Sequence, residues 1–177
     1  MTDDVAERTN ISAAMQASVG KVLGRRVSYP VAESDIRRWA IAVNYPQRPP
    51  REYWDERHAA AGGHGGIVAP LDFNPFAWLT REPGFATGEV GDNDPDNTEK
   101  ALGIDGPGLK FQLNGGMSVA YGVRMRPGDV ITSVSRLAGY RERSGRLGLM
   151  LMSTTEDTWT NQRGETVKKL AVTLIRY

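Results

Sequence analysis

Hydrophobic residues in the first third of the chain recur at helical spacing. Between residues 11 and 23 they fall at i, i+4, i+8 and i+11, which predicts an amphipathic helix that ends at Gly24. A second helix is expected to begin at Ser34, a suitable N-cap, because a helical stripe follows it at Ile36, Trp39, Ala40 and Val43. A third helix is expected over residues 52–61, closing on Gly62 and Gly63.

The most hydrophobic stretch of the chain covers residues 67–79. We interpret it as a buried central helix that begins after Pro70 and restarts at Pro75. Residues 81–108 are rich in glycine, proline and acidic residues, which predicts a long irregular loop.

The last third of the chain has the pattern of an antiparallel meander. Strands are expected over residues 118–125, 130–140, 147–159 and 166–177, with turns at 126–129, 141–145 and 161–164, and a short extended stretch at 27–31. In the last strand hydrophobic residues alternate at Leu170, Val172 and Leu174, as in a half-buried strand. Helices followed by strands predict an α+β fold, which we take as one domain over residues 1–177 with an N-terminal arm at 1–19.

Composition narrows the functions that this domain could have. Hydrophobic residues make up 40% and charged residues 24%, the proportions of an ordinary globular protein. The absence of cysteine excludes thiolate nucleophiles and cysteine-based zinc sites, and two histidines are few for a metal centre, so we expect no metal and no cofactor. The chain has no basic cluster interleaved with aromatics, no membrane-spanning run and no leader-like start. We therefore expect a cytoplasmic protein that does not bind nucleic acid and does not span a membrane.

Four segments together resemble the MaoC-like dehydratase family. They are the helical stretch 35–43, Gly65-Gly66-Ile67-Val68-Ala69-Pro70, Met125-Arg126-Pro127-Gly128-Asp129-Val130-Ile131, and Asn161-Gln162-Arg163-Gly164-Glu165. The resemblance implies a hot-dog fold, in which an antiparallel sheet wraps around a central helix. It also implies an acyl thioester of coenzyme A or acyl carrier protein as substrate, hydrated reversibly to the (3R)-hydroxyacyl product.

The residues that carry catalysis in active members of that family are missing here. Those members place an aspartate and a histidine in a D-x-N-P-x-H stretch after the second helix, where this chain has Asn44-Tyr45-Pro46-Gln47-Arg48-Pro49-Pro50-Arg51. Tyrosine and arginine are poor general bases at neutral pH. A second position that often holds histidine is occupied by Asn114-Gly115-Gly116. The chain therefore resembles the N-terminal, non-catalytic half-domain of the family.

A few polar residues near the expected pocket remain candidates. His64 and Asp72 are the only imidazole and carboxylate there, and we keep them as an alternative catalytic pair; an exposed loop histidine and a helix cap are the simpler interpretations. For substrate binding we consider Asn74, Asn114, Gly115 and Arg51, although Asn-Gly-Gly is also typical of a turn.

Three functions remain open at this point. The first is a subunit that shapes the acyl channel for a second MaoC-like chain carrying the catalytic pair. The second is a homodimeric hydratase that uses His64 and Asp72. The third is a non-catalytic module that binds acyl thioesters.

Overall fold

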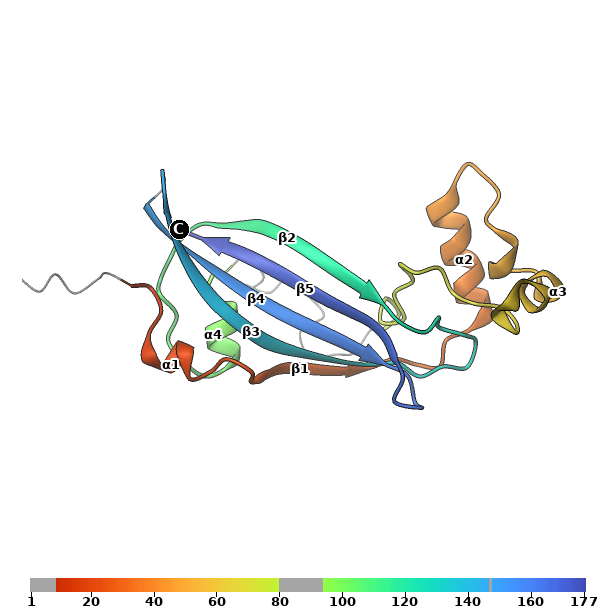
Figure 1. The fold of residues 1–177 in the computed structure, drawn as a ribbon, viewed down its shortest axis with the longest axis horizontal. Coiled ribbons are helices and arrows are strands. Elements are labelled where there is room, and N and C mark those ends of the chain that lie inside the picture. The colour runs from red at the N-terminus through yellow and green to blue at the C-terminus, as the bar shows by residue number, and fades with distance from the viewer. Residues whose placement is uncertain (1–8, 80–93, 147) are drawn as a thin grey trace, which may run out of the picture.

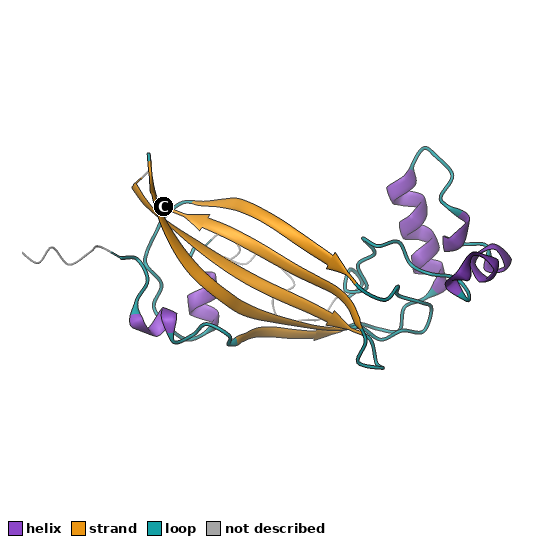
Figure 2. Ribbon diagram, viewed as in Figure 1, coloured by secondary structure: helices purple, strands orange, loops and turns teal. Residues whose placement is uncertain are grey.

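A five-stranded antiparallel sheet forms the body of the molecule (Figure 1, Figure 2). The computed structural model describes residues 9–79, 94–146 and 148–177. The strand order is β1-β3-β4-β5-β2, so β1 and β2 are the two edge strands. The strands are β1 (Val22–Val27), β2 (Gln112–Tyr121), β3 (Thr132–Gly145), β4 (Gly148–Thr160) and β5 (Thr166–Arg176). The α+β prediction is confirmed, and β3, β4 and β5 follow one another as in the predicted meander. The strand expected before them, β2, pairs with β5 and not with β3.

Several strand boundaries differ from the prediction. β2 ends at Tyr121 rather than at residue 125, β3 begins at Thr132 rather than at residue 130, and of the extended stretch expected at 27–31 only Val27 lies in a strand. β2 begins at Gln112, six residues before the expected start at 118, and it contains a register shift between Asn114 and Gly116. β3 continues to Gly145 through the range predicted as a turn, because residues 141–145 pair with the first residues of β4.

The predicted helix over residues 11–23 is wrong for most of its length. Only α1 (Ala13–Gln16) is helical, and Ser12 caps its N-terminus. From Gly20 onward the backbone bonds to β3 instead, beginning with the Gly20 N–H to the carbonyl of Leu137 at 2.7 Å. The residues expected to end the helix therefore form β1, because sheet pairing satisfies their backbone groups.

The helices of residues 33–64 lie beyond one end of the strands (Figure 1). The predicted second helix is α2 (Glu33–Asn44), although its N-cap is Ala32 rather than Ser34. Its stripe buries Ile36 and Ala40 completely, whereas Val43 is exposed. The third predicted helix is broken into η1 (Arg51–Tyr53), α3 (Glu56–Ala59) and η2 (Ala60–His64).

The segment of residues 67–79 is buried as predicted, but it is not a helix. Single turns join Phe73 to Pro70 and Leu79 to Phe76 through backbone hydrogen bonds. The Asn74 side chain accepts the N–H of Phe76 at 3.0 Å, which competes with helical pairing. Two prolines in this stretch remove further donors. The segment still supplies much of the core, where Ile67, Ala69, Phe73, Phe76 and Leu79 pack with Ile36, Ile131 and Trp159.

A short helix within the range predicted as irregular is held to the sheet by a buried ion pair. In α4 (Asn97–Ala101) the Glu99 carboxylate is fully buried against the Arg176 guanidinium of β5, with both contacts at 2.8 Å. The Tyr140 hydroxyl of β3 donates to the same carboxylate at 2.6 Å. Burial alone would raise the pKa of Glu99, but the bonds from Arg176 and Tyr140 outweigh it and hold that pKa below its usual range.

Two of the segments that carry the family resemblance are in contact. Asp129, in the Arg-Pro-Gly-Asp turn, is buried and accepts the backbone N–H of Arg126 at 2.9 Å. Arg163 and Gln162, in the hairpin between β4 and β5, both donate to the Asp129 carboxylate at 3.1 Å. The two turns therefore form one unit at this end of the sheet.

We predict that Glu99→Gln destabilises the protein by roughly 3 kcal/mol, because it leaves the Arg176 charge buried without its main partner. Because the pKa of Glu99 is lowered on folding, its contribution is present above the ordinary value of 4.5 and is lost as the pH falls through the lowered pKa. Urea unfolding at neutral pH measures the effect. The control is Glu33→Gln, which breaks the exposed pair with Arg37 and is expected to cost less than about 1 kcal/mol. Equal losses in the two variants would contradict the prediction.

Candidate functional site

The loop after α2, where active MaoC-like enzymes would place their catalytic pair, presents no general acid or base. The Asn44 side chain donates to the Ala40 carbonyl at 2.8 Å, so its amide is used within the helix. Tyr45 is 82% exposed. The Arg51 guanidinium donates to Asp55 at 2.7 Å, and the same carboxylate caps α3 through the His58 N–H. Arg51, predicted to bind substrate, is thus part of a local cap, although most of its side chain is exposed.

His64 and Asp72 do not form a pair in this structure. His64 is the last residue of η2, in the helical region, and no hydrogen bond or ion pair joins it to Asp72 within the described part of the chain. Asp72 instead accepts a hydrogen bond of 2.7 Å from the Tyr121 hydroxyl at the end of β2. Their catalytic role stays a prediction.

The other predicted binding residues make local backbone contacts. The side-chain oxygen of Asn74 accepts the backbone N–H of Phe76, as described above. The Asn114 side chain accepts the Gly116 N–H at 2.8 Å, inside the bulge of β2. Gly115 is packed so closely that an added Cβ would lie 2.9 Å from the Ile175 side chain. These positions shape the strand, and their role in binding substrate stays a prediction.

A polar and aromatic cluster beside Asp72 has no recognisable pattern in the sequence. Register pairs Tyr121 of β2 with Lys168 of β5, and Lys168 with Trp159 of β4, so the three side chains form a row across the sheet. The Lys168 ammonium lies 5.4 Å from the Tyr121 ring and 4.8 Å from the Trp159 ring. The hydrogen bond to Asp72, with partial burial and the carboxylate charge, raises the pKa of Tyr121. Only the strand register brings these residues together.

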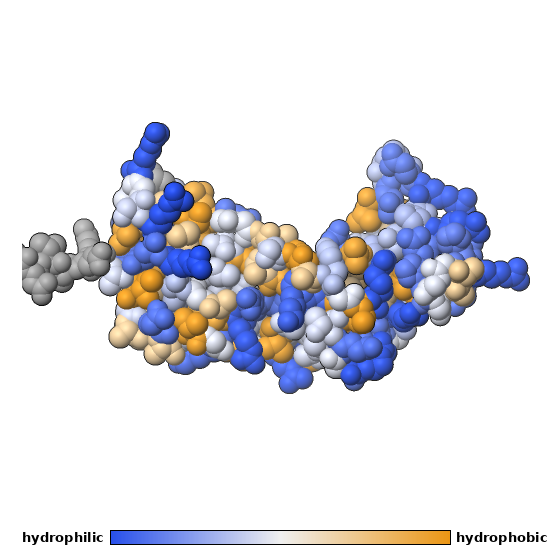
Figure 3. Space-filling model, viewed as in Figure 1, coloured by the Kyte–Doolittle hydropathy of each residue, from blue (hydrophilic) through white to orange (hydrophobic). Residues whose placement is uncertain are grey.

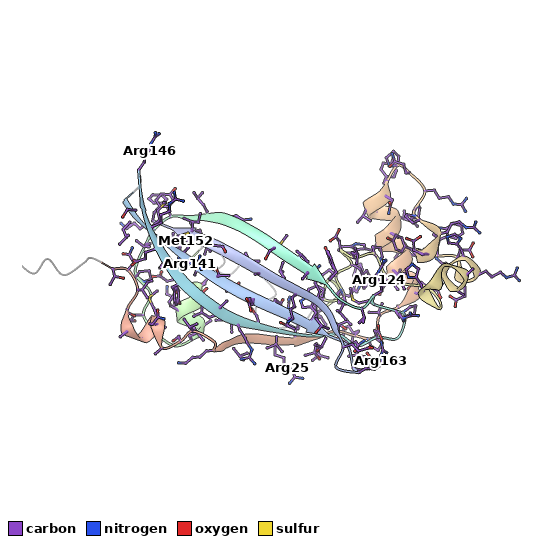
Figure 4. All side chains as sticks on the ribbon, viewed as in Figure 1. Arg25, Arg124, Arg141, Arg146, Met152 and Arg163 are labelled. Carbon is purple, nitrogen blue, oxygen red and sulfur yellow. The ribbon has the colours of Figure 1, made fainter. Side chains whose placement is uncertain are left out.

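Arg124 holds the segment around Ala69 in place. Its guanidinium donates to the Ala69 carbonyl through two nitrogens, at 3.2 and 2.7 Å. The Ala69 N–H donates in turn to the backbone carbonyl of Met125 at 2.8 Å. The Arg124 charge also lies 5.8 Å from the Tyr53 ring, and Figure 4 shows Arg124 between the sheet and the helical region. Figure 3 shows the surface hollowed between these two parts.

The edge strand β2 exposes hydrophobic side chains. Met117 is 64% exposed and Leu113 is 50% exposed, and Phe111 beside the strand is 62% exposed. One side of β2 pairs with β5, and the other has no neighbouring strand among the residues that the structure describes. An edge of this kind is suited to pairing with another strand.

Two classes of site find no support in the described residues. Among residues 9–79, 94–146 and 148–177, His, Asp and Glu side chains form no group of three that could hold a metal ion. In the same part of the chain, no helix has the length and hydrophobicity needed to cross a membrane.

Comparison with known proteins identifies related sequences and folds. Residues 17–170 match the family model described as FAS1-like, dehydratase domain region. A search of curated proteins found no match.

Several solved structures share the fold. The ChsH1–ChsH2 complex from Mycobacterium tuberculosis contains a chain with 20% identity and a TM-score of 0.63, covering 93% of this chain and 88% of that one. A MaoC-like dehydratase from Rhodospirillum rubrum has 20% identity and a TM-score of 0.54, with coverage of 90% and 92%. The HadBC (3R)-hydroxyacyl-ACP dehydratase complex from M. tuberculosis has 18% identity and a TM-score of 0.51, with coverage of 89% and 99%. The hot-dog fold is therefore confirmed.

We predict that Arg124→Met releases the segment around Ala69, because it removes two charge-assisted hydrogen bonds to one buried carbonyl. The expected loss of stability is about 1–3 kcal/mol. Hydrogen exchange at the Ala69 amide, measured by NMR, should accelerate. Arg25→Met is the matched control, since Arg25 is exposed and has no ion-pair partner among the described residues (Figure 4). Unchanged exchange at Ala69 in Arg124→Met would contradict the assignment.

Proposed function

This chain belongs to the family of FAS1-like dehydratase domain regions, and we propose that it is the non-catalytic subunit of a MaoC-type hydratase or dehydratase. The observation that carries the proposal is the loop of residues 44–51, which holds neither a carboxylate nor an imidazole on an otherwise family-like fold. Hydration of a 2-enoyl thioester needs groups that activate water and move the proton at the α carbon. In this proposal a partner subunit supplies them, and this chain shapes the acyl channel.

The partner in this proposal is a second hot-dog chain with an aspartate and histidine in the corresponding loop. The exposed hydrophobic residues of β2 support this, because pairing this edge with a second sheet would remove Met117 and Leu113 from water and satisfy the free backbone groups. Two of the structures that share the fold are complexes, ChsH1–ChsH2 and HadBC. In this proposal the partner contributes the catalytic residues, and this chain contributes residues 67–79 as one wall of the acyl channel.

A second candidate function is hydration by this chain alone, as a homodimer. The contact between Asp72 and Tyr121 favours it, because it holds a carboxylate in a defined position beside the row of Tyr121, Lys168 and Trp159. His64 does not contact Asp72 within the chain, so a second copy would have to bring an acid or base to the same substrate.

We predict that the purified chain alone does not hydrate crotonyl-CoA or longer 2-enoyl thioesters, and that activity appears on co-expression with a MaoC-like chain that carries the D-x-N-P-x-H stretch. Loss of the thioester's enoyl absorbance measures the reaction. In the active complex, His64→Ala in this chain should leave the rate within about twofold, whereas replacing the partner's histidine should abolish it. Activity of the chain alone that is lost in His64→Ala or Asp72→Asn would establish the homodimeric enzyme instead. Saturable thioester binding without turnover in either preparation would leave a binding module.

We predict that Met117→Lys weakens assembly with the partner by about tenfold or more, because it would bury a charge at the strand edge. Analytical ultracentrifugation of the co-purified complex measures the dissociation constant. Val22→Lys is the control, since Val22 is a similarly exposed hydrophobic residue on β1, the opposite edge of the sheet. Equal effects of the two substitutions would argue against β2 as the interface.

A further inference from the structure

We propose that Lys168 of β5 binds a carboxylate on the acyl group and so selects thioesters of dicarboxylic acids. This inference rests on the function proposed above, because it names a substrate class for the same acyl channel. The Lys168 ammonium lies between two aromatic rings, 4.8 Å from the centre of the Trp159 ring and 5.4 Å from that of Tyr121. It is therefore a cation held in a defined place on the sheet.

Two contacts between the sheet and residues 67–79 flank this cation. On one side, the Trp159 ring packs edge to face on the Phe76 ring, with the ring centres 5.0 Å apart. On the other side, the Tyr121 hydroxyl donates to Asp72 at 2.7 Å. Both rings that hold the ammonium thus touch the segment that forms a wall of the proposed channel. An acyl chain that runs along this segment passes close to Lys168.

The ammonium has no oxygen acceptor in the described part of the protein. The Lys168 side chain is partly buried, and its contacts there are with the two rings; no hydrogen bond or ion pair among the described residues involves it. Aromatic rings attract a cation through the charge of their faces, but they supply no oxygen to its N–H groups. A partly desolvated ammonium with free donors is suited to an anionic oxygen.

The two carboxylates bonded to this row of side chains are engaged elsewhere. Asp157 accepts the indole N–H of Trp159 at 3.0 Å and pairs with Arg26 at 3.5 Å. Asp72 accepts the Tyr121 hydroxyl and makes no ion pair with Lys168. No carboxylate of the described residues therefore balances Lys168 at contact distance, and its charge favours an anionic ligand over a neutral one.

The segment beside the row offers hydrophobic surface for the rest of the acyl chain. Leu71 is 42% exposed and Trp78 is 44% exposed, and they lie on either side of Asp72 and Phe76 in the sequence. Hydrophobic surface next to a free cation suits a ligand that has an apolar chain and a negatively charged end. The mono-thioester of a dicarboxylic acid is such a ligand.

The test compares 2-enedioyl mono-thioesters of coenzyme A with 2-enoyl thioesters of the same chain length, in the complex with the partner subunit. The readout is the ratio of the two kcat/KM values, which reports recognition of the carboxylate because carrier and thioester are shared. Lys168→Met should lower this ratio by about tenfold or more, since it removes a charge-assisted hydrogen bond. Lys168→Glu should lower it further, because two carboxylates repel each other.

Lys169→Met is the matched control. Lys169 is the next residue of β5, is exposed, and lies on the opposite face of the sheet. Its replacement should leave the ratio within about twofold, and circular dichroism should show that all variants are folded. Equal losses in Lys168→Met and Lys169→Met would overturn the proposal. So would a weakened complex with an unchanged ratio in Lys168→Met, which would assign Lys168 to a carboxylate of the partner subunit.

A binding measurement separates this inference from the proposed function. Isothermal titration calorimetry of the complex with glutaryl-CoA and pentanoyl-CoA reports binding alone, because neither thioester has a double bond to hydrate. Glutaryl-CoA should bind about tenfold more tightly, and Lys168→Met should remove the difference. If the complex hydrates no thioester, the proposed function fails, and this difference still supports the role of Lys168. If 2-enoyl thioesters are hydrated but the two saturated thioesters bind equally, this inference alone fails.

Discussion

The pairing register of β4, β5 and β2 decides which side chains meet in this molecule. It sets Lys168 opposite both Trp159 and Tyr121, and it turns Arg176 toward the face on which α4 lies. A slip of one residue along β5 would move Lys168 and Arg176 to the opposite face of the sheet, away from Trp159, Tyr121 and α4. The buried pair of Arg176 and Glu99 opposes such a slip, because it would leave both charges without partners. The ion pair therefore secures the alignment on which the candidate site depends.

The sequence predicted the elements whose hydrophobic period is unbroken and failed where backbone groups had competing partners. The alternating pattern of Leu170, Val172 and Leu174 identified β5, and the stripe of Ile36 and Ala40 identified α2. The stretch 67–79 was correctly expected to be buried, but hydrophobicity alone does not separate a helix from a series of packed turns. In this stretch the Asn74 side chain and two prolines favour turns over a continuous helix. The pattern places residues 22 and 23 in a helix, because the partner that pairs with them, β3, lies more than a hundred residues later in the chain.

The same contrast applies to the candidate site. What the chain lacks, a carboxylate and an imidazole after α2, could be read directly from residues 44–51. The contacts that the site does contain could not be predicted from the sequence. Tyr121 and Lys168 are neighbours only through strand pairing, and Glu99 lies in a range without a clear helical pattern.

The contact between the Arg-Pro-Gly-Asp turn and the β4–β5 hairpin has a consequence for how such chains are classified. Asp129 is the buried acceptor for Arg163 and Gln162, so both segments serve to close the same end of the sheet. That closure stabilises the sheet whether or not a subunit performs chemistry. A chain without the catalytic acid and base can therefore keep the sequence motifs by which its family is recognised. Those motifs indicate common ancestry and a common fold. Whether a chain is catalytically active has to be judged from the loop after α2.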